Sequence, residues 1–71
     1  MLRHLKFQIE HLKQKANVSS ISELAEIVDI RRATLSELAN GKRQRIQFDH
    51  IEKIADKLNI EDIREIIDFD D

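Results

Sequence analysis

A cluster of basic residues in the middle of the chain has the composition expected of a phosphate-binding surface. The cluster comprises Arg31, Arg32, Lys42, Arg43 and Arg45. Residues 31–45 contain a single acid, Glu37, so their local net charge is +4, whereas the whole chain carries −2 and residues 59–71 carry −5. The local electrostatic field, rather than the total charge of the chain, determines whether a phosphate group is attracted to a surface. The cluster therefore favours contact with nucleic acid over the alternative of an ordinary solvated surface.

The basic cluster surrounds a segment that is predicted to form two short helices joined by a tight turn. Ser20 is suited to cap the first helix, and Glu23, three residues later, completes a capping box. Apolar residues at helical spacing give this helix an inward face. The second helix is expected to begin near residue 31 and to end at Asn40-Gly41, because both residues tolerate the left-handed conformation that closes a helix.

The second helix is predicted to have one apolar face and one polar face. Leu35 and Leu38 share one side, and a step of 100° per residue places Arg32 at the edge of the other side. The residues opposite the leucines are Ala33, Ser36, Glu37 and Asn40. A helix pair that packs on one side and leaves short polar side chains on the other is typical of a helix-turn-helix that presents one helix to a DNA groove.

The same segment resembles the phage-repressor and Cro-like helix-turn-helix family, often called the XRE family, over about residues 9 to 67. The matching stretches are Glu23-Leu24-Ala25, Ile30, Ala33-Thr34-Leu35-Ser36, Asn40-Gly41-Lys42, Ile51-Glu52-Lys53-Ile54-Ala55 and Leu58-Asn59-Ile60. In this family the turn usually carries Gly where Asp29 stands. The resemblance implies a compact five-helix bundle of the lambda-repressor-like type, sequence-specific DNA binding and regulation of transcription, with repression as the expected effect.

The remaining residues supply the rest of a single all-α domain spanning residues 1–71. Apolar periodicity predicts a first helix over 2–16, a fourth over 48–58 and a fifth over about 60–67. Phe7 falls almost opposite the apolar stripe of the first helix. The chain contains no Cys, so neither a disulfide nor a Cys-ligated metal is expected.

The residue types around the second helix suggest specific DNA contacts. Arg can form two hydrogen bonds with guanine, Glu can accept one from cytosine, and an Ala methyl can contact the thymine methyl. The expected base-reading residues are Arg32, Ala33, Ser36 and Glu37. Backbone N–H groups at the start of the first helix of the pair would hold a phosphate. The expected phosphate-binding residues are Ser20, Ile21, Arg31, Thr34, Asn40, Lys42, Arg43 and Arg45.

The partner implied by the resemblance is double-stranded DNA, bound by a homodimer on a two-fold site with half-sites ~34 Å apart. Four large apolar residues near the C-terminus, from Ile63 to Phe69, cover a wider arc than one packing face of a helix needs. We expect one of Ile66 and Ile67 to serve the core and the other, with Phe69, to form the dimer interface. Phe7 is the alternative interface residue.

No cofactor, metal site or active site is predicted from the sequence. His4 and His11 lack a third ligand at suitable spacing, and the serines lack a neighbouring base, so we expect no enzyme activity. No apolar run approaches the ~20 residues of a membrane span, and no signal peptide is visible, so a cytoplasmic location is expected. Two alternative functions are an antitoxin-like or other protein-interaction module, and a DNA-binding accessory of a mobile element.

Overall fold

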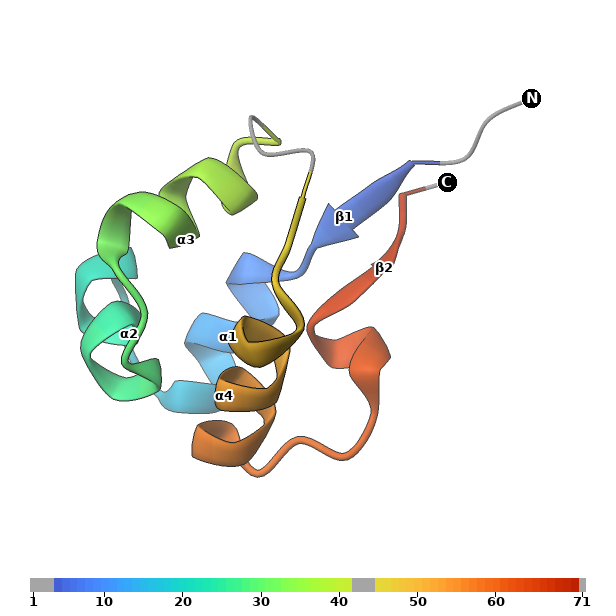
Figure 1. The fold of residues 1–71 in the computed structure, drawn as a ribbon. Coiled ribbons are helices and arrows are strands. Elements are labelled where there is room, and N and C mark those ends of the chain that lie inside the picture. The colour runs from blue at the N-terminus through green and yellow to red at the C-terminus, as the bar shows by residue number, and fades with distance from the viewer. Residues whose placement is uncertain (1–3, 42–44, 71) are drawn as a thin grey trace.

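The computed structural model describes residues 4–41 and 45–70, which form a mostly helical fold with a small sheet (Figure 1). The elements in chain order are β1 (Leu5–Phe7), α1 (Ile9–Ala16), α2 (Ile21–Val28), α3 (Arg32–Ala39), α4 (Phe48–Leu58), the 3-10 turn η1 (Ile63–Glu65) and β2 (Ile67–Phe69). The predicted helix-turn-helix is formed by α2 and α3. None of the helices within the described ranges is long and apolar enough to cross a membrane.

Local capping signals determine where the central helices begin and end. The Ser20 hydroxyl accepts a hydrogen bond from the Glu23 backbone N–H at 3.1 Å, which confirms the predicted N-cap of α2. Three helices end at a residue in the left-handed conformation: Asn17 after α1, Asp29 after α2 and Asn59 after α4, with φ of 59°, 58° and 55°. Asn and Asp tolerate this conformation better than most residues, so each helix stops where such a residue is available.

The hydrophobic core lies between the helices and the inner end of the sheet. Its most deeply buried side chains come from five elements or their flanks and are Leu12, Leu24, Val28, Leu35, Ile54 and Ile66. They pack against a border of half-buried apolar residues that includes Ile21, Ile51 and Ile67. Helix α2 contacts α1, α3 and α4, so it holds the other helices in place around this core.

The N-terminal segment differs from the predicted helix over 2–16. Residues Leu5–Phe7 form the strand β1, and the helix begins only at Ile9. β1 pairs with β2 in antiparallel register, with Leu5 opposite Phe69, Lys6 opposite Asp68 and Phe7 opposite Ile67. The alternation of apolar and polar residues over this short stretch fits a strand as well as a helix, and pairing with a distant segment favours the strand.

The predicted fifth helix is also replaced, by η1 and β2, so the expected five-helix, all-α bundle is wrong in this detail. The Asp62 carboxylate accepts from the Arg64 backbone N–H at 3.0 Å and caps a single 3-10 turn. The chain then extends into β2, where the Gln8 N–H donates to the Ile66 carbonyl and the Asp70 N–H donates to the His4 carbonyl, both at 2.8 Å. Both ends of the described chain therefore lie side by side in Figure 1.

Two of the candidate residues for a dimer interface, Phe7 and Ile66, are buried in this arrangement. Phe7 is 8% exposed and Ile66 is 0% exposed, so both belong to the core of one chain rather than to its surface. Phe7 is buried because the strand turns it toward the helices. Ile67 is half-buried and Phe69 is 49% exposed, so of the candidate interface residues Phe7, Ile66, Ile67 and Phe69, Phe69 presents the largest apolar surface.

Candidate nucleic-acid interface

The turn between α2 and α3 is held firmly against the rest of the fold. Asp29 adopts the left-handed conformation, with φ 58° and ψ 46°, at the position where a glycine is usual in this type of turn. Ile30 is buried, and its N–H donates to the Ala25 carbonyl at 3.2 Å. The Lys53 ammonium from α4 donates to the Asp29 carbonyl at 3.4 Å. The start of α3 is therefore fixed relative to both α2 and α4.

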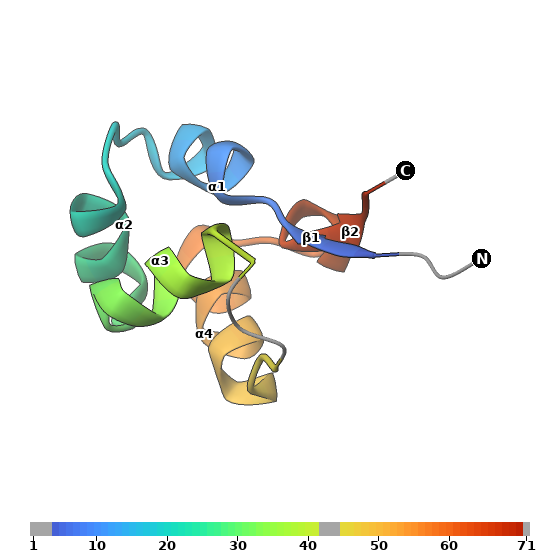
Figure 2. The same cartoon turned by 90° about the horizontal axis from the view of Figure 1, so that it is seen from above.

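Helix α3 has the two faces predicted from the sequence. Leu35 and Leu38 are buried, whereas Arg32, Ala33 and Glu37 are exposed and lie on the opposite side. Ser36 is half-buried at the border between the faces. In Figure 1 the helices α1, α2 and α4 all lie below α3, and in Figure 2, seen from above, none of the other described helices passes over it. The polar face of α3 is thus accessible to a large ligand.

The predicted phosphate contacts have mixed placements. Arg31, Asn40 and Arg45 are exposed at the two ends of α3 and beyond it, and Arg31 occupies the N-cap position without capping through its side chain. Ser20 and Ile21 are half-buried at the start of α2. Lys42 and Arg43 lie outside the described residues. The prediction that Thr34 contacts phosphate must be corrected. Its side chain is 7% exposed, so its hydroxyl is not available at the surface.

Thr34 is buried for a simple geometric reason. It precedes Leu38 by four residues, which is about one helical turn, so both side chains lie on the same face of α3. The hydroxyl of Thr34 is suited to bind phosphate, but this spacing places it on the inward face. Arg31, at the N-cap of α3, remains an exposed cation next to the polar face.

A comparison with protein families agrees with this geometry. The family model of the Cro/C1-type helix-turn-helix DNA-binding domain matches residues 8–71. The chain belongs to this family. No curated protein and no solved structure gives a significant match to the chain. The match begins at the residue after β1, so it covers α1, α2, α3 and α4 of this Cro/C1-type domain.

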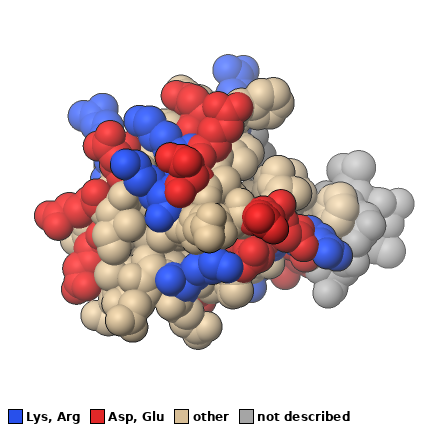
Figure 3. Space-filling view, turned by 90° about the horizontal axis from the view of Figure 1, so that it is seen from below, with Lys and Arg blue, Asp and Glu red and all other residues tan. Residues whose placement is uncertain are grey.

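The side of the Cro/C1-type domain turned away from α3 differs from the α3 side in how its charged residues are distributed. Figure 3 shows this side, where acidic and basic side chains are interspersed rather than gathered by sign. Neighbouring opposite charges compensate each other's field. The face shown therefore lacks the continuous positive surface that would attract a phosphate backbone, unlike the sequence around α3 with its local charge of +4.

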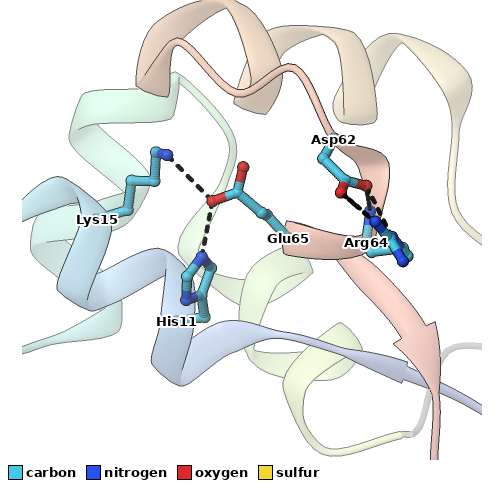
Figure 4. A network of polar contacts seen from close by, with 5 residues as sticks. All are labelled: His11, Lys15, Asp62, Arg64 and Glu65. Atoms are coloured by element: carbon cyan, nitrogen blue, oxygen red, sulfur yellow. Dashed lines mark hydrogen bonds and ion pairs between the residues drawn. The ribbon is translucent and has the colours of Figure 1, made fainter.

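A cluster of polar contacts that the sequence analysis did not predict joins α1 to the C-terminal segment (Figure 4). The Glu65 carboxylate accepts from His11 Nε2 at 2.9 Å and from Lys15 Nζ at 3.0 Å. These two donors, the histidine first, hold the pKa of Glu65 below its ordinary value. We call these three residues the α1–η1 clamp. Glu65 lies 54 positions from His11 and 50 positions from Lys15, so no local pattern could have revealed the clamp.

A second ion pair lies beside the clamp. The Arg64 guanidinium donates to both carboxylate oxygens of Asp62, with the shortest distance 2.8 Å, and lowers the pKa of Asp62 to about 2. The Asp62–Arg64 pair and two residues of the clamp, His11 and Glu65, border a shallow, open groove of about 430 Å³. Gln8 and Asp68 also line this groove. No cluster of His, Cys, Asp and Glu in the described ranges is arranged to hold a metal ion. The groove residues thus act mainly on one another, and the α3 surface is the stronger candidate site.

Proposed function

We propose that this Cro/C1-type domain is a sequence-specific transcriptional regulator, with repression as the expected effect, and that α3 reads the major groove of DNA. The observation that supports this most directly is the division of α3. The helix buries Leu35 and Leu38 against the core and leaves Arg32, Ala33 and Glu37 exposed. In a DNA-binding domain, an accessible helix face of this kind next to a basic cluster is suited to base contact.

The dimensions of α3 support the same proposal. α3 has eight residues, and an α-helix with its side chains is about 10–12 Å across, which fits the width of the major groove, roughly 12 Å. Arg32, Ala33, Ser36 and Glu37 are spaced i, i+1, i+4 and i+5, so they form one stripe along the helix. Arg32 would donate to guanine, Glu37 would accept from cytosine, and Ala33 would contact a thymine methyl.

Phosphate contacts at both sides of α3 would position this stripe. The N-terminus of α2, at Ser20 and Ile21, offers backbone N–H groups to a phosphate. Arg31, Asn40 and Arg45 are exposed and would contact the backbone, as would Lys42 and Arg43 from the basic cluster. Such contacts set the register of the protein on DNA without specifying sequence. A homodimer on a two-fold site would double both sets of contacts.

The experiment that tests the proposal is selection of bound sequences from a random double-stranded DNA library, followed by gel shifts with the selected site. We expect an enriched motif, tighter binding to it than to random DNA, and affinity that falls steeply with salt because phosphate contacts release counterions. Lys57→Ala is the control for removal of one positive charge, since Lys57 lies exposed in the last turn of α4. Enrichment no greater than that of an unrelated protein would contradict the proposal.

A further inference from the structure

The chain contains three asparagines, and each of them lies at the C-terminal end of a helix. Asn17 follows α1, Asn40 follows α3 and Asn59 follows α4. All three are exposed. They differ in the residue that comes next, because a β-branched residue follows Asn17 and Asn59, whereas Gly41 follows Asn40. A β-branched side chain crowds the backbone nitrogen beside it, and glycine leaves that nitrogen open to approach.

We propose that Asn40–Gly41 is a site of spontaneous deamidation and that the carboxylate formed there weakens DNA binding. In this reaction the Gly41 backbone nitrogen attacks the side-chain carbonyl carbon of Asn40. A new C–N bond forms, the bond to the side-chain nitrogen breaks, and that nitrogen leaves as ammonia together with the proton of the Gly41 N–H. Water then opens the succinimide ring at either carbonyl, which gives aspartate or isoaspartate without any oxidant or reductant.

The backbone nitrogen that must attack is held more loosely after Asn40 than after the other two asparagines. The Gly41 N–H donates to the Leu38 carbonyl at 3.3 Å, which is beyond the usual N–H···O range of about 2.7–3.2 Å. The N–H groups that follow the other two asparagines donate to carbonyls of α1 and α4 at 3.0 and 2.8 Å. Freeing the Gly41 nitrogen therefore breaks the longest of these three hydrogen bonds.

The surroundings of Gly41 permit the backbone rotation that ring closure needs. Asn40 has ψ 0°, so its backbone must rotate before the Gly41 nitrogen faces the side-chain carbonyl. Gly41 is exposed, and no atom of the described residues beyond its chain neighbours lies within 4 Å of the position that a Cβ would take. Ile60, which follows Asn59, is instead 8% exposed and belongs to the core. Because helix ends open more readily than packed segments, the fold leaves Asn40 free to react and restrains Asn59.

The reaction places a negative charge at the C-terminal end of α3. That end already carries the negative pole of the helix, so a carboxylate is unfavourable there. Isoaspartate also lengthens the backbone at the residue before Gly41. The effect on binding rests on the proposed DNA-binding function, in which Asn40 contacts the phosphate backbone, because phosphates repel a carboxylate. The protein would then lose affinity for DNA with time, without the action of an enzyme.

The modification is measured by incubating the wild-type protein in mildly alkaline buffer and analysing the peptides that carry each asparagine by mass spectrometry. We expect aspartate and isoaspartate to accumulate at Asn40 well before Asn17 or Asn59. The rate should rise with pH, because the attacking nitrogen must lose its proton. The same incubation in urea gives the rates without the fold. Equal rates at the three positions in the folded protein, or conversion of Asn40 in urea alone, would overturn the proposal.

The effect on binding is measured by gel shifts with the selected site and with random DNA. Asn40→Asp reproduces one product and should bind both DNAs roughly tenfold more weakly, equivalent to about 1.4 kcal/mol. Asn59→Asp makes the same change of charge at the end of α4, far from α3 in Figure 1, and should bind like the wild type. Circular dichroism checks that both variants are folded. Wild-type affinity of a folded Asn40→Asp protein would overturn the proposed effect on binding.

A time course separates this inference from the proposed function. Wild-type protein should lose affinity in step with the conversion of Asn40. Asn40→Gln should keep its own starting affinity, because its longer side chain closes a ring far more slowly. Unchanged wild-type affinity after Asn40 has been converted would overturn the inference alone. If fresh wild-type protein binds DNA without sequence preference, the proposed function alone is wrong, and if it binds no DNA, the proposed loss of binding is wrong as well.

Discussion

Replacing Ile66 with alanine should destabilise the domain much more than the same change at Ile63. The two residues are three positions apart and would face the same side of a continuous helix. In the structure Ile66 is 0% exposed, between η1 and β2, whereas Ile63 is 53% exposed. The difference between the two substitutions therefore tests whether the chain leaves the helical path at this point.

The expected magnitude follows from the buried side chain. Ile→Ala removes three carbon atoms, worth about 0.8 kcal/mol each in transfer free energy, or about 2.4 kcal/mol. A cavity that cannot collapse raises the loss to about 3–4 kcal/mol, within the usual range of roughly 2–5. Ile63→Ala loses about half of the transfer contribution and leaves no cavity, so about 1 kcal/mol is expected. In a domain of this size each kcal/mol lowers Tm by about 4–8 °C.

The assay is thermal and urea denaturation followed by far-ultraviolet circular dichroism. If Ile66→Ala unfolds too far to measure, Ile66→Val, with an expected loss of about 0.5–1.5 kcal/mol, keeps the comparison quantitative. Its control is Ile63→Val, which should change the free energy of unfolding little. Equal losses at positions 63 and 66 would show that both residues face the core, as in a continuous fifth helix, and would refute the assignment of η1 and β2.

Three further predictions concern other parts of the molecule. Asp29→Gly should raise the free energy of unfolding, measured by urea denaturation, by up to about 1 kcal/mol, because glycine relieves the left-handed strain at φ 58°. Part of this gain is lost because glycine makes the unfolded chain more flexible. A loss of stability would contradict this prediction. Hydrogen bonds from His11 and Lys15 lower the pKa of Glu65 in the folded state, so its stabilisation is present above the unfolded pKa and lost as pH falls through the folded pKa. Glu65→Gln should therefore be less stable than the wild type at neutral pH and equal to it in acid, and a constant difference across pH would refute the clamp. Glu37→Gln should bind random-sequence DNA more tightly in gel shifts, because a carboxylate near phosphates is repelled; unchanged binding would place Glu37 outside the DNA field.

The helix-turn-helix could be predicted from the sequence because its signals are local. The Ser20 hydroxyl caps α2 by accepting from the Glu23 N–H, only three residues later. The apolar residues Leu35 and Leu38 both lie within α3, so their helical spacing can be recognised in a short stretch of sequence. The exposed positions of α3 at Arg32, Ala33 and Glu37 follow from the same periodicity. Thr34 was the exception within α3, since its polar chemistry suggested a surface role that its position on the inward face does not allow.

The two ends of the chain could not be predicted in the same way. Leu5, Lys6 and Phe7 alternate over too few residues to separate a strand from a helix. The strand is stabilised by pairing with Ile67–Phe69, about 60 positions away, and no local pattern encodes that contact. The α1–η1 clamp is a contact of the same long-range kind, because Glu65 lies 54 positions from His11.

The central claim, that α3 specifies the DNA sequence, is tested most directly by repeating the site selection with Arg32→Ala. We predict a loss of about 1–3 kcal/mol on the wild-type site and relaxed preference at one base position, while Lys57→Ala retains the wild-type motif and affinity. Because Arg32 lies exposed at the first residue of α3, its loss should change which sequences are selected as well as how tightly they bind. Equal losses on the selected site and on random DNA, with an unchanged motif, would show that Arg32 contacts phosphate alone and would contradict the proposed reading by α3.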